Sequence, residues 1–203
     1  MSKFTTLCLL GLFPFAAAAA LPDAAQAQNA PAQEAPTGAP FFTNCLYGFA
    51  IIFPERPQQR DINYATNNGK LQPAHQFFVE KGPNRYQVTV VDFFDGPKAD
   101  SQIVEHAAAN LKLRGALFHE DFATYDPGMP GHQLNIFETK ERQIRASVYM
   151  AEHRLYIIEA SASSGDIPAV QFEQSITLVD EMGWDLDRIA PNGEPSPRQF
   201  KCR

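Results

Sequence analysis

The chain has 203 residues and a formal net charge of −6 at neutral pH, with 44% hydrophobic and 20% charged residues. This length and composition suit one globular domain with a sizeable core. An acidic chain without a long basic run lacks the electrostatic signature of nucleic-acid binding, so no nucleic-acid partner is expected.

The N-terminal segment predicts export. Lys3 supplies a positive start, residues 4–20 form a largely apolar run, and residues 25–27 (AQA) have the small-x-small pattern that signal peptidase requires. We therefore expect residues 1–27 to be a signal peptide that is removed before Gln28. The mature protein would then work in the periplasm or outside the cell.

The alternative interpretation of this segment is an uncleaved membrane anchor. A spanning helix needs about 20 apolar residues, whereas Pro14 and Pro22 bracket a shorter run here. No other segment approaches that length, so no membrane span is expected after cleavage. Cleavage would leave 176 residues.

After the cleavage site, residues 28–44 are rich in Ala, Pro and Gln and are expected to form a disordered linker. Residues 45–184 are expected to form a single α+β domain, and residues 185–203 an irregular C-terminal tail. We find no internal repeat.

Short apolar runs separated by turn residues predict the strands of this domain. Residues 67–69 (NNG) and 82–84 (GPN) are hairpin turns, because Asn and Gly tolerate positive φ. Residues 86–94 alternate on two apolar faces, which is typical of a central strand. The expected strands cover residues 46–53, 62–65, 75–80, 86–94, 116–123, 133–139, 143–150 and 155–162.

Two segments have helical spacing. Asp100 or Ser101 can cap a helix that runs to about residue 114, and a second helix is expected over residues 167–181. Most strands follow one another with one helix between them and one after them, which predicts an α+β fold. We expect an antiparallel β-sheet of about seven to eight strands with helices packed on its faces.

Four segments resemble bacterial exported domains of the PsbP-like superfamily over residues 46–180. They are GFAIIFPERP (48–57), YQVTVVDF (86–93), RLYIIEASA (154–162) and FEQSITLV (172–179). The resemblance implies an α/β/α sandwich and an accessory or adaptor role without catalytic activity. It carries over no catalytic residues.

Two clusters contain residue types that could serve in catalysis or metal binding. His119, Glu120 and Asp121 lie in one predicted strand, with His106 before it and His132 after it, but no zinc-type spacing is present. A Ser-rich segment at residues 161–165 lacks the G-x-S-x-G pattern and is typical of a turn. Neither cluster predicts a catalytic, cofactor or metal site, so none is assigned.

The pattern of charges offers two further interpretations. Carboxylate pairs such as Glu105 with Glu120 could flank a glycoside, although such pairs are common by chance. Four basic residues crowd the predicted meander and indicate a solvated sheet edge rather than an anion site. They are Lys140, Arg142, Arg145 and Arg154.

Two cysteines remain after export, Cys45 and Cys202, and thiols in an oxidising compartment most often pair. We expect an intramolecular disulfide, with unpaired thiols or an intermolecular bridge as the alternatives. The absence of C-x-x-C spacing argues against a redox-active pair.

The combined features predict a noncatalytic periplasmic or secreted binding or accessory module. Its partner would be an unidentified envelope protein or a small ligand, and no cofactor is expected. The alternative function is an envelope hydrolase or metal-dependent enzyme with a pocket near His119 and Asp121.

Overall fold

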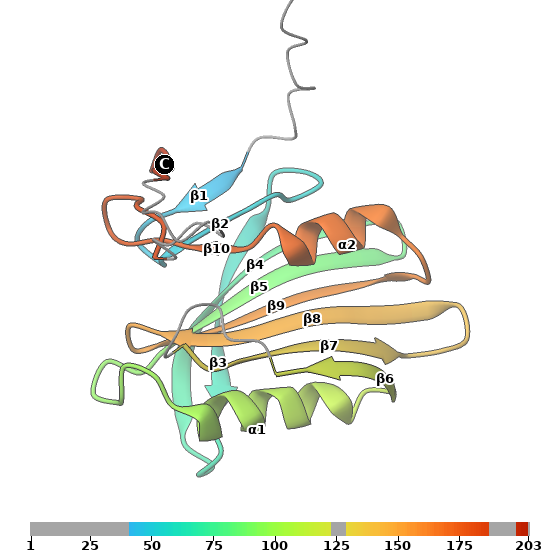
Figure 1. Cartoon of the computed structure of the whole chain (residues 1–203), viewed down its shortest axis with the longest axis horizontal. Helices are drawn as coiled ribbons and strands as arrows, with labels where there is room; N and C mark the ends of the chain where they lie inside the picture. Colours follow the sequence, from blue (N-terminus) through green and yellow to red (C-terminus); the bar gives the residue numbers. More distant parts are fainter. Residues whose placement is uncertain (1–40, 123–128, 187–197, 203) are drawn as a thin grey trace, which may run out of the picture. The chain divides into compact units, whose positions relative to one another are not determined.

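Two antiparallel sheets and two helices make up the described part of the chain (Figure 1). The computed structural model describes residues 41–122, 129–186 and 198–202. The elements are β1 (Phe42–Asn44), β2 (Phe49–Ile51), β3 (Gln58–Ala65), β4 (Leu71–Lys81), β5 (Asn84–Asp92), α1 (Ser101–Lys112), β6 (Ala116–Asp121), β7 (Gly131–Phe137), β8 (Arg142–Ala151), β9 (Arg154–Ser163), α2 (Ile167–Gln174) and β10 (Thr177–Leu178).

The larger sheet has seven strands in the order β3-β4-β5-β9-β8-β7-β6, and every neighbouring pair is antiparallel. The smaller sheet has the order β1-β2-β10. The predicted α+β class and the antiparallel sheet are therefore confirmed. Within the described residues, no helix has the length and apolar character that a membrane span needs. The expected signal peptide and most of the expected linker lie outside the described residues.

The hairpin turns fall where the sequence predicts them. Gly69 and Gly82 have φ values of 76° and 58°, which a residue without Cβ adopts readily. The β8–β9 hairpin turns at Glu152 and His153, whose φ values of 46° and 65° are uncommon for residues other than Gly. The His153 ring is held there by a 2.8 Å hydrogen bond between Nδ1 and the Gly96 carbonyl oxygen. The predicted meander of β7, β8 and β9 is therefore present.

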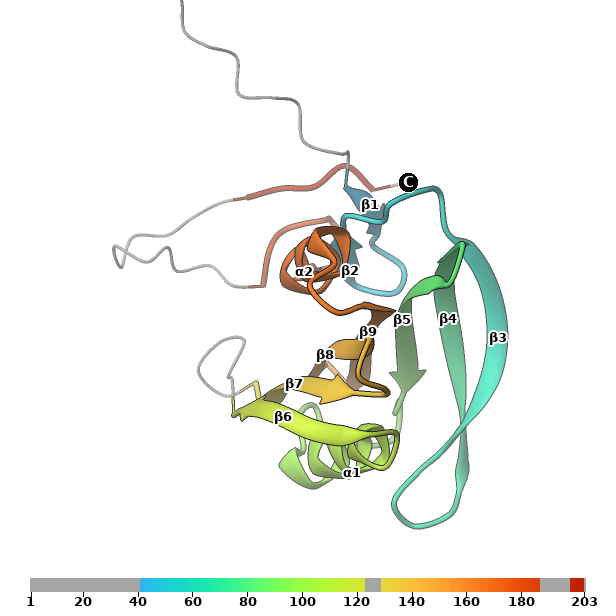
Figure 2. The same cartoon turned by 90° about the vertical axis from the view of Figure 1, so that its right-hand side faces the viewer.

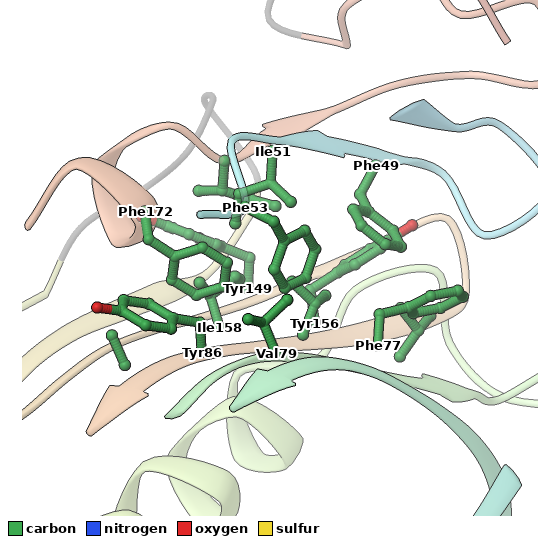
Figure 3. Close-up of a cluster of buried hydrophobic side chains, with 14 of the residues drawn as sticks. Phe49, Ile51, Phe53, Phe77, Val79, Tyr86, Tyr149, Tyr156, Ile158 and Phe172 are labelled. Atoms are coloured by element: carbon green, nitrogen blue, oxygen red, sulfur yellow. The ribbon is translucent and has the colours of Figure 1, made fainter. Parts of the chain in front are cut away.

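The central strands are apolar on both faces because each face packs against a separate layer. Tyr86, Val88 and Val90 of β5 belong to the core on the α2 side, whereas Val91 belongs to the core on the α1 side. On the α2 side, Phe172 lies over Tyr86 with ring centroids 5.6 Å apart (Figure 3). Burying such a large apolar side chain contributes about 1.5–3 kcal/mol to folding.

Helix α1 is stabilised by an N-terminal cap and by an apolar stripe that packs on the sheet. The Asp100 carboxylate accepts a hydrogen bond from the Gln102 backbone N–H at 2.8 Å, which satisfies a free donor of the first turn. The stripe of Val104, Ala107, Ala108 and Leu111 is buried against the sheet. The helix ends at Lys112, two residues before the expected end.

Three expected boundaries were wrong. The strand expected over residues 46–53 is only β2, and it belongs to the small sheet. The helix expected to reach residue 181 ends at Gln174. There the Ser175 hydroxyl donates a hydrogen bond to the Phe172 carbonyl oxygen at 2.9 Å and accepts one from the Ile52 N–H at 2.9 Å. Residues 42–44 of the expected linker form β1, which pairs with β2.

The C-terminal tail returns to the small sheet. Phe200 is buried, and its ring centroid lies 5.1 Å from that of Phe41. Gly183 has a φ of 82°, and a Cβ at this position would collide with the Phe200 carbonyl oxygen. This docking brings Cys202 to Cys45 in the expected disulfide, with Cα atoms 5.5 Å apart.

Replacing Cys45 with Ser should lower the free energy of unfolding by about 2–5 kcal/mol, because the bridge restricts the unfolded chain over a long loop. Both sheets and both helices should remain, as measured by circular dichroism during urea unfolding. The matched control is the Cys45→Ser/Cys202→Ser double variant, which should lose no more than either single variant. Equal stability of the natural protein before and after reduction would contradict this prediction.

Candidate functional site: a polar cavity on the large sheet

The α1 side of the large sheet is apolar at one end of the strands and polar at the other. In β5, Val91 packs under α1, but Thr89, Gln87 and Arg85 follow at alternate positions on the same face. Helix α1 contacts β7, β8 and β9 and ends at Lys112, so among the described residues no helix covers the polar end of this face.

Arg114, just beyond α1, begins a salt-bridge network on this polar end. Its guanidinium lies 2.6 Å from a carboxylate oxygen of Glu159 in β9 and 3.0 Å from one of Glu138. Burial opposes the charged form of Arg114, but the attraction of Glu159 and Glu138 outweighs it and raises the pKa of the guanidinium. Arg142 Nε lies 3.8 Å from Glu138 Oε2. The two arginines and two glutamates of this network balance in charge.

Beside the network is a cavity of about 460 Å³, here called the polar cavity. Its lining includes Glu80, Arg85, Gln87, Arg142, Glu159 and Ser161. Three atoms of lining residues, Asn84 Oδ1, Arg85 Nε and Gln87 Oε1, are buried and have no hydrogen-bond partner within the described residues. An unpaired buried polar atom costs roughly 1–3 kcal/mol, so a ligand that paired these atoms would recover that cost.

Two other cavities are bordered largely by turns and loops rather than by strand-borne polar groups. One, of about 480 Å³, lies near the disulfide, and two of its charged residues, Glu152 and Arg154, are paired with Lys98 and Asp92 respectively. The other, of about 550 Å³, borders the turn after β3 and the start of α1. The polar cavity differs in having buried polar atoms without partners, which makes it the candidate site.

The residues of the alternative enzyme site do not line any of these three cavities. His119 and Asp121 are exposed on β6, the edge strand of the large sheet. Glu120 instead joins a cluster with α1, since its carboxylate lies 2.8 Å from Lys112 Nζ and 3.0 Å from His132 Nδ1. Of these three residues, Glu120 alone enters this cluster, which the sequence pattern does not predict.

His132 lies between Glu105 and Glu120, the carboxylate pair that the sequence offers for glycoside chemistry. It is buried, and its second ring nitrogen, Nε2, lies 2.9 Å from Glu105 Oε1. Glu105 and Glu120 therefore face one imidazole from opposite sides rather than an open groove. In the part of the chain that the structure describes, no group of three or more His, Cys, Asp or Glu side chains is arranged to hold a metal ion.

The prediction that the basic residues of the meander mark a solvated sheet edge was wrong. Strands β8 and β9, which carry Arg142, Arg145 and Arg154, lie inside the seven-stranded sheet. Each of these arginines lies near a carboxylate, of Glu138, Glu173 and Asp92 respectively. Arg142 in addition lines the polar cavity.

The cavity residues Arg85, Gln87 and Glu159 are not among the residues expected from the sequence to form a site. A signal was present, because Arg85, Gln87 and Thr89 alternate with Tyr86, Val88 and Val90. Such alternation is also typical of an ordinary solvent-facing strand surface. Only the fold shows that Glu159 and Arg114 close this surface into a cavity.

Replacing Glu120 with Gln should make stability less dependent on acid pH. The hydrogen bond from Lys112 holds the pKa of Glu120 below its ordinary value, with a smaller contribution from His132. A lowered folded-state pKa contributes stability above the unfolded-state pKa of about 4.3, and this stability is lost as pH falls through the folded-state pKa.

Urea unfolding at several pH values should show Glu120→Gln less stable than the natural protein at pH 7, with the difference shrinking below about pH 4. The matched control is Glu141→Gln, at an exposed position between β7 and β8, which should change little. A difference for Glu120→Gln that persists unchanged at acid pH would contradict the prediction.

Comparison with known proteins was negative in two respects: no protein-family model and no curated protein matches the chain. The resemblance to PsbP-like domains therefore stays a prediction from sequence patterns. The polar cavity itself carries the functional proposal.

Proposed function

We propose that the mature protein is an exported, noncatalytic module that binds a small polar ligand in the polar cavity. The observation that carries this proposal is the group of three buried atoms without partners, Asn84 Oδ1, Arg85 Nε and Gln87 Oε1. They supply one donor and two acceptors beside a cavity of about 460 Å³, a volume within the range of small-molecule sites.

Two features support export to the periplasm or beyond. Residues 1–27 have the charge, apolar run and cleavage pattern of a signal peptide. The Cys45–Cys202 disulfide suits an oxidising compartment, because cytosolic thiols are kept reduced. The antiparallel sheet with one helix on each side is also compatible with a PsbP-like domain.

The surroundings of Ser161 support the noncatalytic part of the proposal. Its hydroxyl donates to Glu138 Oε2 at 2.5 Å and accepts from Arg142 Nη2 at 2.9 Å. Glu138 is also bound to Arg114. A general base needs a lone pair that is free to take a proton, and a nucleophile needs one that is free to attack. Here Arg142 already occupies one of the two lone pairs of the Ser161 oxygen, and Arg114 engages Glu138 Oε1, so both groups are tied into the salt-bridge network.

Intact-mass measurement of exported protein should find a chain that begins at Gln28. Only that position follows both the apolar run and the AQA pattern at residues 25–27. Expression of a variant with Ala27→Pro should block processing and serve as the control. An envelope-fraction protein that still begins at Met1 would contradict the prediction.

Ligand binding is tested on the mature protein with glycerol, glucose, lactate, succinate and inorganic phosphate. At least one probe should raise the midpoint of thermal unfolding, because a ligand that binds only the folded state stabilises it. Gln87→Leu, which removes one of the two unpaired acceptors, should weaken binding of a hydroxylated probe by roughly fivefold to tenfold. The matched control is Gln59→Leu, at an exposed position of β3, which should bind normally.

The same samples test the absence of catalysis. Proton NMR spectra of each stabilising probe should be unchanged after a day with the protein. Consumption of a probe would favour the enzyme alternative, and a complete lack of stabilisation by all five probes would contradict the binding proposal.

A further inference from the structure

Two arginine side chains converge on the polar face of the large sheet. Arg60 of β3 donates through Nε to the Gln76 side-chain oxygen at 2.8 Å. Arg85 of β5 donates through Nη2 to the same oxygen at 3.2 Å. Both guanidinium groups also lie over the Phe78 ring, 4.9 Å and 5.6 Å from its centroid. Arg60 and Arg85, here called the arginine pair, are therefore within a few ångström of each other.

The group that joins the arginine pair is held rigidly. Gln76 is only 6% exposed, and its amide nitrogen donates to the Thr89 hydroxyl at 3.2 Å. With its nitrogen engaged by Thr89, Gln76 directs its oxygen toward the two arginines. Thr89 is itself 5% exposed. A buried amide fixed in this way makes the arginine pair a feature of the folded sheet rather than a chance surface contact.

The arginine pair has no counter-ion in the described part of the chain. No ion pair joins either guanidinium to a carboxylate there, although Glu80 lies opposite Arg85 in the β4–β5 register. The neighbouring network of Arg114, Arg142, Glu138 and Glu159 is already balanced. Two like charges held close together repel each other, and an anion between them would convert this repulsion into attraction.

We propose that the polar cavity binds a small hydroxylated molecule through a carboxylate or phosphate group seated at the arginine pair, where Arg85 of the cavity lining meets Arg60, which lies beside the lining. This proposal rests on the proposed function and adds the chemical class of its ligand. The oxyanion accepts hydrogen bonds from Arg85 Nε and from the remaining N–H groups of Arg60 and Arg85. A hydroxyl of the same molecule donates to Gln87 Oε1, one of the two unpaired acceptors among the lining residues. Glu80 and the negative charge of the whole protein disfavour ligands with several additional negative charges.

The first measurement compares oxyanions with chloride at equal ionic strength. Lactate and succinate test the carboxylate form of the ligand, and glycerol 3-phosphate and inorganic phosphate test the phosphate form. At a concentration about 100-fold above its Kd, a binding oxyanion should raise the midpoint of thermal unfolding by about 5–10 °C relative to sodium chloride. Stabilisation by either chemical form supports the proposal, and the stronger one identifies the source.

Arginine variants test whether oxyanions bind at the arginine pair. Arg85→Gln and Arg60→Gln should each weaken oxyanion binding by about tenfold or more in isothermal titration calorimetry, because each removes a charged donor. The matched control is Arg56→Gln, at an exposed position before β3, which should bind as the natural protein does. Calorimetry below the unfolding temperature separates a loss of binding from a loss of stability.

Gln76→Glu tests the same idea without any ligand. This substitution keeps the shape of the side chain and places a carboxylate between Arg60 and Arg85, while the Thr89 hydroxyl can donate to it. The variant should unfold at a higher temperature than the natural protein in oxyanion-free buffer. It should also lose the additional stabilisation by lactate and phosphate, because the site already contains an anion.

Three results would overturn the proposal: stabilisation by oxyanions no greater than by chloride, equal binding by Arg85→Gln, or full oxyanion stabilisation of Gln76→Glu. These results leave the proposed function standing if glucose or glycerol still binds in a way that Gln87→Leu weakens. If no probe of any kind binds, the proposed function fails as well.

Discussion

The alternation of side chains along the central strands is the constraint on which the rest of the structure depends. Strands β5, β8 and β9 direct successive side chains to opposite faces, and both faces carry large apolar groups. Each face therefore has to be covered by its own layer. Helix α1 covers one face, while α2 and the small sheet cover the other (Figure 2). The disulfide and the docked tail hold the small sheet to the C-terminus.

The polar cavity exists because this coverage is incomplete on the α1 side. The helix ends at Lys112, and the chain turns sharply at Gly115, where a Cβ would collide with the Phe137 carbonyl oxygen. A glycine permits that close approach and lets β6 begin beside β7. Arg114 is thereby placed over Glu159 rather than in the helix. Beyond this point the strands expose polar side chains on the same face that is apolar under α1.

Charge on this uncovered surface is distributed unevenly. Arg114 and Arg142 are neutralised by Glu138 and Glu159, whereas Arg60 and Arg85 share two uncharged groups, the amide oxygen of Gln76 and the Phe78 ring. The protein as a whole is acidic, so an unbalanced cationic pair stands out against its net charge of −6. A guanidinium presents several N–H donors in one plane, which matches the oxygens of a carboxylate or phosphate. This match, rather than general attraction of anions, gives the proposed site its specificity.

The sequence by itself determined the features that depend on neighbouring residues. Asp100 capped a helix with an apolar stripe, Gly69 and Gly82 marked hairpin turns, and Tyr86, Val88 and Val90 marked one face of a central strand. Each of these follows from local backbone geometry and side-chain period. The pairing of Cys45 with Cys202 was expected from the number of cysteines and the compartment.

Only the tertiary structure decided how the site residues meet. The turn at residues 67–69 already implies that Arg60 lies opposite Gln76, but the expected strand began at Ile62 and left Arg60 outside it. Strand β3 is an edge strand whose first residues are polar, so its hydrogen bonds to β4, not an apolar pattern, extend it to Gln58. The approach of Arg114 to Glu159, 45 positions apart, depends on where α1 ends and how it packs. These are long-range relations, set by strand register and helix packing, that local patterns do not contain.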